Sequence, residues 1–111
     1  MDFDAMMAEL RQEYLADLPG VINNLKTAHS DANGEEVHRI FHQLKGSGKT
    51  YGFDEITELC KIMESSTKDN SIPDSCNDAI SLLEAILEKR SSNETVNLNL
   101  DPRYIKLLQG Q

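Results

Sequence analysis

Apolar residues recur every three or four positions along most of the 111-residue chain, which is the spacing of amphipathic helices. The first such segment runs from about Asp4 to Asp17. Pro19-Gly20 should break or kink it, because proline removes a backbone donor and clashes with the preceding turn. The pattern then continues to about His29. Its apolar positions are Phe3, Met6, Met7, Leu10, Tyr14, Leu18, Val21, Ile22, Leu25 and Ala28.

Three more helices follow. A polar loop over 30–34 precedes a helix that opens at Gly34, has two carboxylates at its positive end and runs to about Thr50. Gly52 separates it from a third helix, which starts near Phe53 and ends before the polar run at 65–71. A fourth helix is predicted from Pro73, as its first helical residue, to about residue 90.

The chain ends in a polar linker at 91–95 and an apolar tail. Val96, Leu98 and Leu100 alternate in a weakly strand-like or extended pattern, and Asp101-Pro102 predicts the start of a short helix over 102–109. Without repeats or convincing strands, the class is all-α. We expect an antiparallel up-down four-helix bundle with an extra N-terminal helical segment, made of residues 1–90, and a C-terminal tail at 91–111.

The acidic balance of the chain limits its partners. The net charge of −8 argues against nucleic acid or an anionic membrane as the main partner. Residues 37–53 nevertheless hold Arg39, Lys45 and Lys49 and no acidic residue, so this segment carries +3 and the remainder −11. A local basic patch on an acidic protein indicates a local anionic target.

Targeting and redox signals favour a cytoplasmic protein. No segment approaches the roughly 20 apolar residues that span a bilayer. The acidic start, Met1-Asp2-Phe3-Asp4, lacks the basic residues of a signal peptide. Cys60 and Cys76 fall on the apolar faces of two helices, which predicts reduced, buried cysteines.

The helix over 37–53 has one exposed histidine. At roughly 100° per residue, His42 points about 140° from the centre of the apolar stripe, into solvent. His38, Lys45 and Lys49 lie beside it, and Gly46 lies one turn beyond it. An exposed glycine inside a helix costs about 1 kcal/mol relative to alanine. This glycine is reasonable if a second protein must approach the imidazole closely, and the lysines are reasonable if the histidine carries a dianionic group.

The motif His42-Gln43-Leu44-Lys45-Gly46-Ser47, followed by Tyr51-Gly52-Phe53 and an apolar helix with Cys60 and Met63, resembles the histidine-containing phosphotransfer (HPt) domain family. The looser resemblance extends over about 6–90. It implies that His42 is phosphorylated and exchanges the phosphoryl group with an aspartate of a response-regulator receiver domain. It also implies a hybrid sensor histidine kinase as a partner, no cofactor on this chain and a magnesium ion on the receiver.

The same resemblance assigns the neighbouring residues. Lys45 would neutralise charge on the phosphoryl group. Arg39, Gln43, Gly46 and Lys49 would form the docking face, with an apolar rim from the first helix. Glu64, 22 residues after His42, would reach the imidazole and orient it if the two helices form an antiparallel hairpin. Several family members carry a glutamine near this position, so the glutamate is a departure or a variant. An ordinary surface glutamate is an equally good interpretation.

Parts of the sequence also resemble three other kinds of site or module. Gly46-Ser47-Gly48-Lys49-Thr50 imitates a phosphate-binding loop, but Gln43 stands where the first glycine belongs and a helix precedes it instead of a strand. His38 and His42 at i and i+4 suit a metal, but Arg39 replaces the glutamate of hydrolytic zinc helices and Lys45 would repel a cation. The chain could also be a non-catalytic interaction module that binds a receiver domain, or a metal through His38 and His42.

Overall fold

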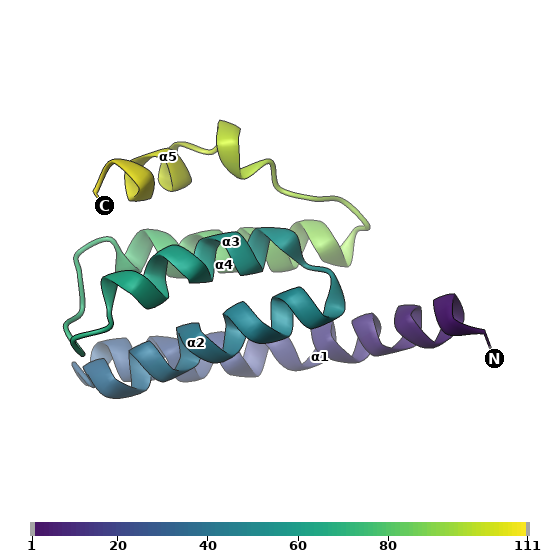
Figure 1. The fold of residues 1–111 in the computed structure, drawn as a ribbon, viewed down its shortest axis with the longest axis horizontal. Coiled ribbons are helices and arrows are strands. Elements are labelled where there is room, and N and C mark those ends of the chain that lie inside the picture. Colours follow the sequence, from purple (N-terminus) through teal and green to yellow (C-terminus); the bar gives the residue numbers. More distant parts are fainter. Residues whose placement is uncertain (1, 111) are drawn as a thin grey trace.

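A computed structural model gives the fold of residues 2–110. Within this range the chain forms helices and no strand. They are α1 (Phe3–Ser30), α2 (Gly34–Tyr51), α3 (Asp54–Ser66), α4 (Cys76–Ser91), the 3₁₀ helix η1 (Leu98–Leu100) and α5 (Pro102–Gln109). From α1 to α4 each helix reverses the direction of the one before it (Figure 1). The all-α class is therefore confirmed, with the up-and-down order expected of the bundle.

The most extensive contact between helices joins α2 to α3, the hairpin that positions the site. Asn33 caps the start of α2 by accepting a hydrogen bond from Glu36 N at 3.2 Å. Gly52 ends the helix with a φ of 80°, a left-handed conformation that glycine adopts without strain. At the crossing, a Cβ on Gly48 would lie 2.9 Å from Oγ1 of Thr57, so the absence of a side chain there lets the two helices approach closely.

Of the break or kink predicted at Pro19-Gly20, the break is wrong, because α1 continues through Pro19 as one helix of 28 residues. Pro19 and Gly20 face solvent, so the carbonyl that loses its partner lies on the side of the helix where water is available. On the neighbouring face of the helix Leu18, Ile22 and Leu25 are buried in the core. Their burial on both sides of the proline stabilises the helix against the cost of one missing hydrogen bond.

The first turns of α1 extend beyond the other helices (Figure 1). Phe3 is 68% exposed and Met6 42% exposed, although both lie on the apolar stripe of the helix. The extra N-terminal segment is thus a continuation of the first bundle helix. On its apolar face Met7 and Leu10 are partly buried, and Tyr14 is the first residue that packs against the core.

The start of the fourth helix and the structure of the stretch after it also differ from the prediction. Pro73 precedes the fourth helix instead of opening it, and α4 starts at Cys76 after a turn in which Cys76 N bonds Pro73 O at 3.0 Å. The stretch predicted as extended contains η1, whose Asn97 side chain accepts from Asn99 N. Alternation of apolar residues over so few positions does not distinguish a strand from a 3₁₀ turn.

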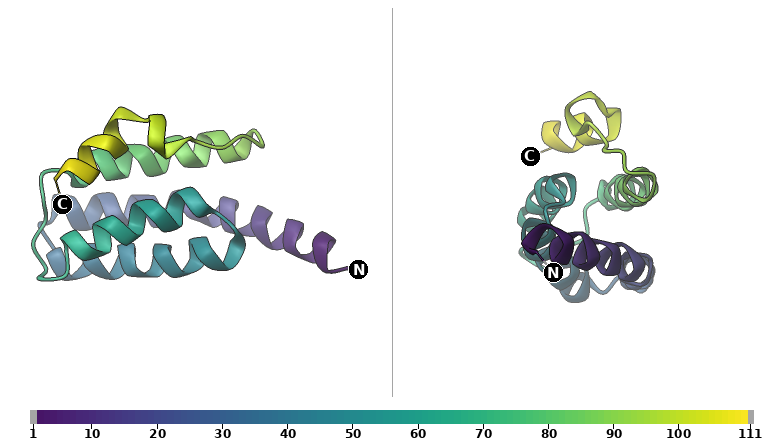
Figure 2. Two further views of the ribbon diagram at one scale, coloured as in Figure 1. Left: turned by 45° about the horizontal axis from the view of Figure 1, so that its top comes forward. Right: turned by 90° about the vertical axis from the view of Figure 1, so that its right-hand side faces the viewer.

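The C-terminal tail lies along α4 and also contacts α3 (Figure 2). Leu98, Tyr104 and Leu107 are buried with the bundle core. Arg103 is held by Asp101 Oδ2 at 2.8 Å and donates to Ser81 Oγ on α4 at 2.9 Å. The tail thus adds to the hydrophobic core, while the division of the chain at residue 90 stays a prediction.

The two cysteines lie where the sequence predicts them. Cys60 and Cys76 are both buried and neither forms a disulfide. Burial raises the pKa of the Cys76 thiol to about 11. Both groups are therefore poorly reactive core side chains at neutral pH.

Candidate functional site

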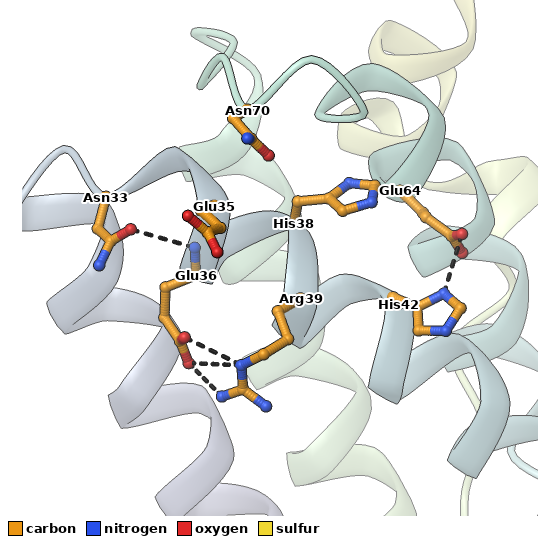
Figure 3. Close-up of a pocket in the computed structure, with 8 residues that line it drawn as sticks. All are labelled: Asn33, Glu35, Glu36, His38, Arg39, His42, Glu64 and Asn70. Carbon is orange, nitrogen blue, oxygen red and sulfur yellow. Dashed lines mark hydrogen bonds and ion pairs between the residues drawn. The ribbon is translucent and has the colours of Figure 1, made fainter.

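The centre of the candidate site is the imidazole of His42, on the outer side of α2. Its side chain is 64% exposed, while Phe41 and Leu44 on the inner side of the same helix are buried. Nδ1 of the ring lies 3.0 Å from Oε1 of Glu64 on α3. The other ring nitrogen, Nε2, faces away from that carboxylate (Figure 3). One nitrogen is thus engaged by the protein and the other is accessible.

The carboxylate determines which nitrogen of a neutral His42 carries the proton. An ionised carboxylate only accepts hydrogen bonds, so the group that faces Oε1 must be an Nδ1–H donor. The lone pair of the neutral ring is then on Nε2, at the exposed edge. The contact therefore orients the imidazole as a nucleophile that faces solvent.

Glu64 stays ionised because a cation holds its other oxygen. Oε2 is shielded from solvent and lies 2.6 Å from Nζ of Lys45, one turn after His42 on α2. The Lys45 ammonium, and after it His42, lowers the pKa of the Glu64 carboxyl below its ordinary value. Lys45, Glu64 and His42 thus form one connected cluster.

A shallow hollow opens on one side of the ring, between α2, α3 and the loops at their ends (Figure 3). Arg39 and Glu36 form an ion pair there, with Arg39 Nε 2.9 Å from Glu36 Oε2. Within residues 2–110 no three histidine, cysteine or acidic side chains are grouped to hold a metal ion. The lining residues are Asn33, Glu35, Glu36, His38, Arg39, His42, Glu64 and Asn70.

His38 lines the same hollow but is held differently from His42. It is half-buried, and its Nδ1 lies 3.0 Å from the hydroxyl of Thr67. That hydroxyl donates to Met63 O at 2.7 Å, so it accepts from His38 Nδ1–H. His38 is therefore tied to the end of α3 by a buried side chain, and His42 is the more accessible histidine of the two.

The four residues predicted for docking, Arg39, Gln43, Gly46 and Lys49, are all exposed on α2. A Cβ built on Gly46 meets nothing within 4 Å, so its own bundle does not require a glycine there. On the far side of His42 from the hollow, a mainly apolar groove runs between α1 and α2, lined by Tyr14, Asp17, Leu18, Val21, Gln43, Leu44 and Ser47. The exposed backbone at Gly46, which no side chain covers, thus lies next to the apolar groove between α1 and α2.

The sequence did not reveal every contact in this region. Tyr14 Oη lies 2.9 Å from Ser47 Oγ and so fixes α1 against α2 beside Gly46. In the sequence Tyr14 is only one more position of an apolar stripe, and Ser47 is only part of the motif. The pairing of Lys45 with Glu64 likewise depends on the register of the hairpin, which no local pattern gives.

Of three comparisons with known proteins, one finds a match. The family model described as Hpt domain matches residues 9–92, well over half of the chain. Searches of curated proteins and of solved structures return no match. In the part of the chain that the structure describes, no helix is long and apolar enough to cross a membrane.

Proposed function

The chain belongs to the Hpt domain family, whose members carry phosphoryl groups in phosphorelays, and on that premise we propose that His42 is its phosphoryl carrier. The observation that supports this assignment is the exposed ring with Nδ1 on Glu64 and Nε2 in solvent. Family members are carriers and not enzymes in the ordinary sense. Groups that activate the phosphoryl donor are expected on the partner.

The proposed transfer requires little from this chain beyond a positioned nucleophile. The Nε2 lone pair attacks the phosphorus of an aspartyl phosphate, a P–N bond forms, and the P–O bond breaks as the aspartate carboxylate leaves. The ring becomes cationic in this step, and Glu64 at 3.0 Å stabilises the positive charge. The reverse step returns the phosphoryl group to a second aspartate.

Lys45 is the proposed counter-charge for the phosphoryl group. It follows His42 by three residues on the same helix, and its ammonium lies 2.6 Å from Glu64 in the unphosphorylated site. An ammonium has three N–H donors, so Lys45 can keep its ion pair with Glu64 and also donate to a dianionic phosphoryl group on Nε2. A magnesium ion is expected on the partner receiver domain, and no cofactor is expected here.

Partner docking is proposed over the outer side of α2. Gly46 lets a receiver domain approach the ring, while Arg39, Gln43 and Lys49 surround the contact and the groove with Tyr14 and Val21 supplies an apolar rim. Such a contact is transient and small. A hybrid sensor kinase on one side and a response regulator on the other are the proposed partners, in the cytoplasm.

Incubation with a phosphorylated receiver domain tests the carrier role. We expect an acid-labile, base-stable phosphate on the chain, and its loss in His42→Gln with the helical circular dichroism unchanged. His38→Gln is the matched control, because it changes a histidine of the same hollow one turn away. Retained labelling in His42→Gln would move the acceptor to another histidine. Binding of the receiver without labelling would favour an interaction module.

A further inference from the structure

Glu64 contacts Nδ1 of His42, whereas the proposed phosphoryl group is carried on Nε2, so phosphorylation does not by itself displace this contact. This point rests on the proposed function. A phosphorylated imidazole gives up its phosphoryl group with the electron pair of the P–N bond passing to Nε2. With a proton on Nδ1 the leaving group is neutral imidazole, whereas without that proton it is an imidazolate anion, which leaves far more slowly.

We propose that Glu64 is a positioning residue that keeps the Nδ1 proton on phosphorylated His42, so that the chain remains a fast phosphoryl donor to a higher pH than an uncharged partner would allow. Oε1 lies 3.0 Å from Nδ1, and Oε2 is held by Lys45 at 2.6 Å. The carboxylate therefore cannot swing away without breaking an ion pair.

The surroundings of the ring identify Glu64 as the group in question. Among residues 2–110 the hydrogen-bond partner of the His42 ring is Glu64, from α3. On α2 itself, Lys45 is paired to the same carboxylate, and Arg39 is paired to Glu36. His38 and Glu35 complete the titratable lining of the hollow, and α1 contributes Asp17 in the groove beyond Gln43.

The charge of Glu64 sets the expected direction and size of the effect. A negative charge within about 4–6 Å shifts proton binding in proteins by about 1–3 pH units in favour of the cation. His42 is 64% exposed, so solvent screening places the expectation at the lower end, about one unit. At pH values above the midpoint of Nδ1 titration, the fraction of phosphorylated His42 that keeps its Nδ1 proton falls tenfold per pH unit. Loss of the Glu64 charge should therefore slow P–N cleavage about tenfold in this pH range.

The test measures hydrolysis of the phosphorylated protein against pH. The chain is labelled with phosphoramidate, a small donor that needs no docked protein, and release of inorganic phosphate is followed from pH 5 to 10. In this reaction water oxygen forms the new P–O bond, the P–N bond breaks, and the proton of the attacking water passes to solvent. The readout is the pH at which the rate is half its low-pH value.

Glu64→Gln keeps the shape and the hydrogen-bond acceptor but removes the charge. We expect its half-rate pH to lie about one unit below that of the unaltered chain, with hydrolysis about tenfold slower above both midpoints. The matched control is Glu35→Gln, which removes a carboxylate from the same hollow and should leave the profile unchanged. If Glu64→Gln does not fold, Glu64→Asp keeps the charge but draws it back from the ring, and a smaller shift in the same direction is expected.

The outcomes separate this inference from the proposed function. Identical profiles for Glu64→Gln and the unaltered chain, with label on His42 in both, would overturn the inference and leave the carrier role intact. The same shift in Glu35→Gln would overturn it too, because the effect would then come from net charge. Absence of any phosphohistidine at position 42 would overturn both.

Discussion

Substitutions at Gly46 separate the stability of α2 from its accessibility to a partner. The glycine lies inside an 18-residue helix, is exposed, and has no atom within 4 Å of where its Cβ would be. Gly46→Ala should therefore raise the free energy of unfolding by about 1 kcal/mol, the difference in helix propensity. For a domain of this size that corresponds to roughly 4 °C in Tm, measured by circular dichroism.

Gly46→Gln should be about as stable as Gly46→Ala but should accept the phosphoryl group from a receiver domain much more slowly. Glutamine is nearly as good a helix former as alanine, so this variant should also be more stable than the unaltered chain. Its side chain, however, fills the exposed surface over position 46. Forcing extra side-chain volume into a close-packed contact costs about 1–3 kcal/mol, which is a factor of about 5–150 in the transfer rate from a phosphorylated receiver. Labelling by phosphoramidate should stay normal, because a small donor needs no space over position 46.

Gly20 provides the matched control for both changes. It is also exposed within a helix and also has nothing within 4 Å of its Cβ position, but it lies on α1. Gly20→Gln should stabilise the chain without affecting transfer. Normal transfer by a folded Gly46→Gln variant would refute the close-approach argument, and so would an equal loss in Gly20→Gln.

Three further perturbations test the site and the core. Lys45→Ala should slow transfer from a receiver or shorten the phosphohistidine lifetime, and no change in either would reduce the lysine to surface charge. Arg90→Met should cost about 2–3 kcal/mol in urea unfolding, because it leaves the buried Glu55 carboxylate without its partner at 2.9 Å. Burial raises the pKa of the Glu55 carboxyl, but the hydrogen bonds from Arg90 outweigh burial, so the pKa in the folded chain lies below the ordinary 4.5. The stability that the Glu55–Arg90 pair contributes is therefore present above pH 4.5 and is lost as the pH falls through the pKa of folded Glu55. Leu107→Ala should cost about 2–4 kcal/mol if the tail is part of the core, and an unchanged Tm would show that it is not.

Helix positions could be predicted from the sequence where the deciding interactions are local. Asn33 before α2 and Gly52 after it are short-range signals, and the structure uses both. Pro19 is a short-range signal too, but there the burial of Leu18 and Ile22 on the neighbouring face prevails. The rule for proline considers one hydrogen bond and one turn, whereas the outcome depends on the packing of a whole helix face.

Within the candidate site, features that depend on α2 alone could be predicted from the sequence, whereas features that depend on the packing of α2 against α3 could not. The exposure of His42 and Gly46 follows from angles around α2 alone, and the structure places both as the sequence predicts. Glu64 could be named as a candidate only on the assumption of a hairpin, and its 3.0 Å contact depends on the register of α3 against α2. The roles of these residues in transfer stay predictions until phosphate is followed on the protein.

An apolar stripe in a sequence predicts which face of a helix is apolar, but it does not say what covers that face. Phe3 and Met6 continue the stripe of α1 and are exposed, because the neighbouring helices end before them. Leu98 and Leu107, in a tail whose sequence pattern is weak, are buried because α3 and α4 leave an apolar surface that the tail can cover. Burial is a property of pairs of surfaces, so the ends of the chain, where partners are fewest, are where periodicity alone is least informative.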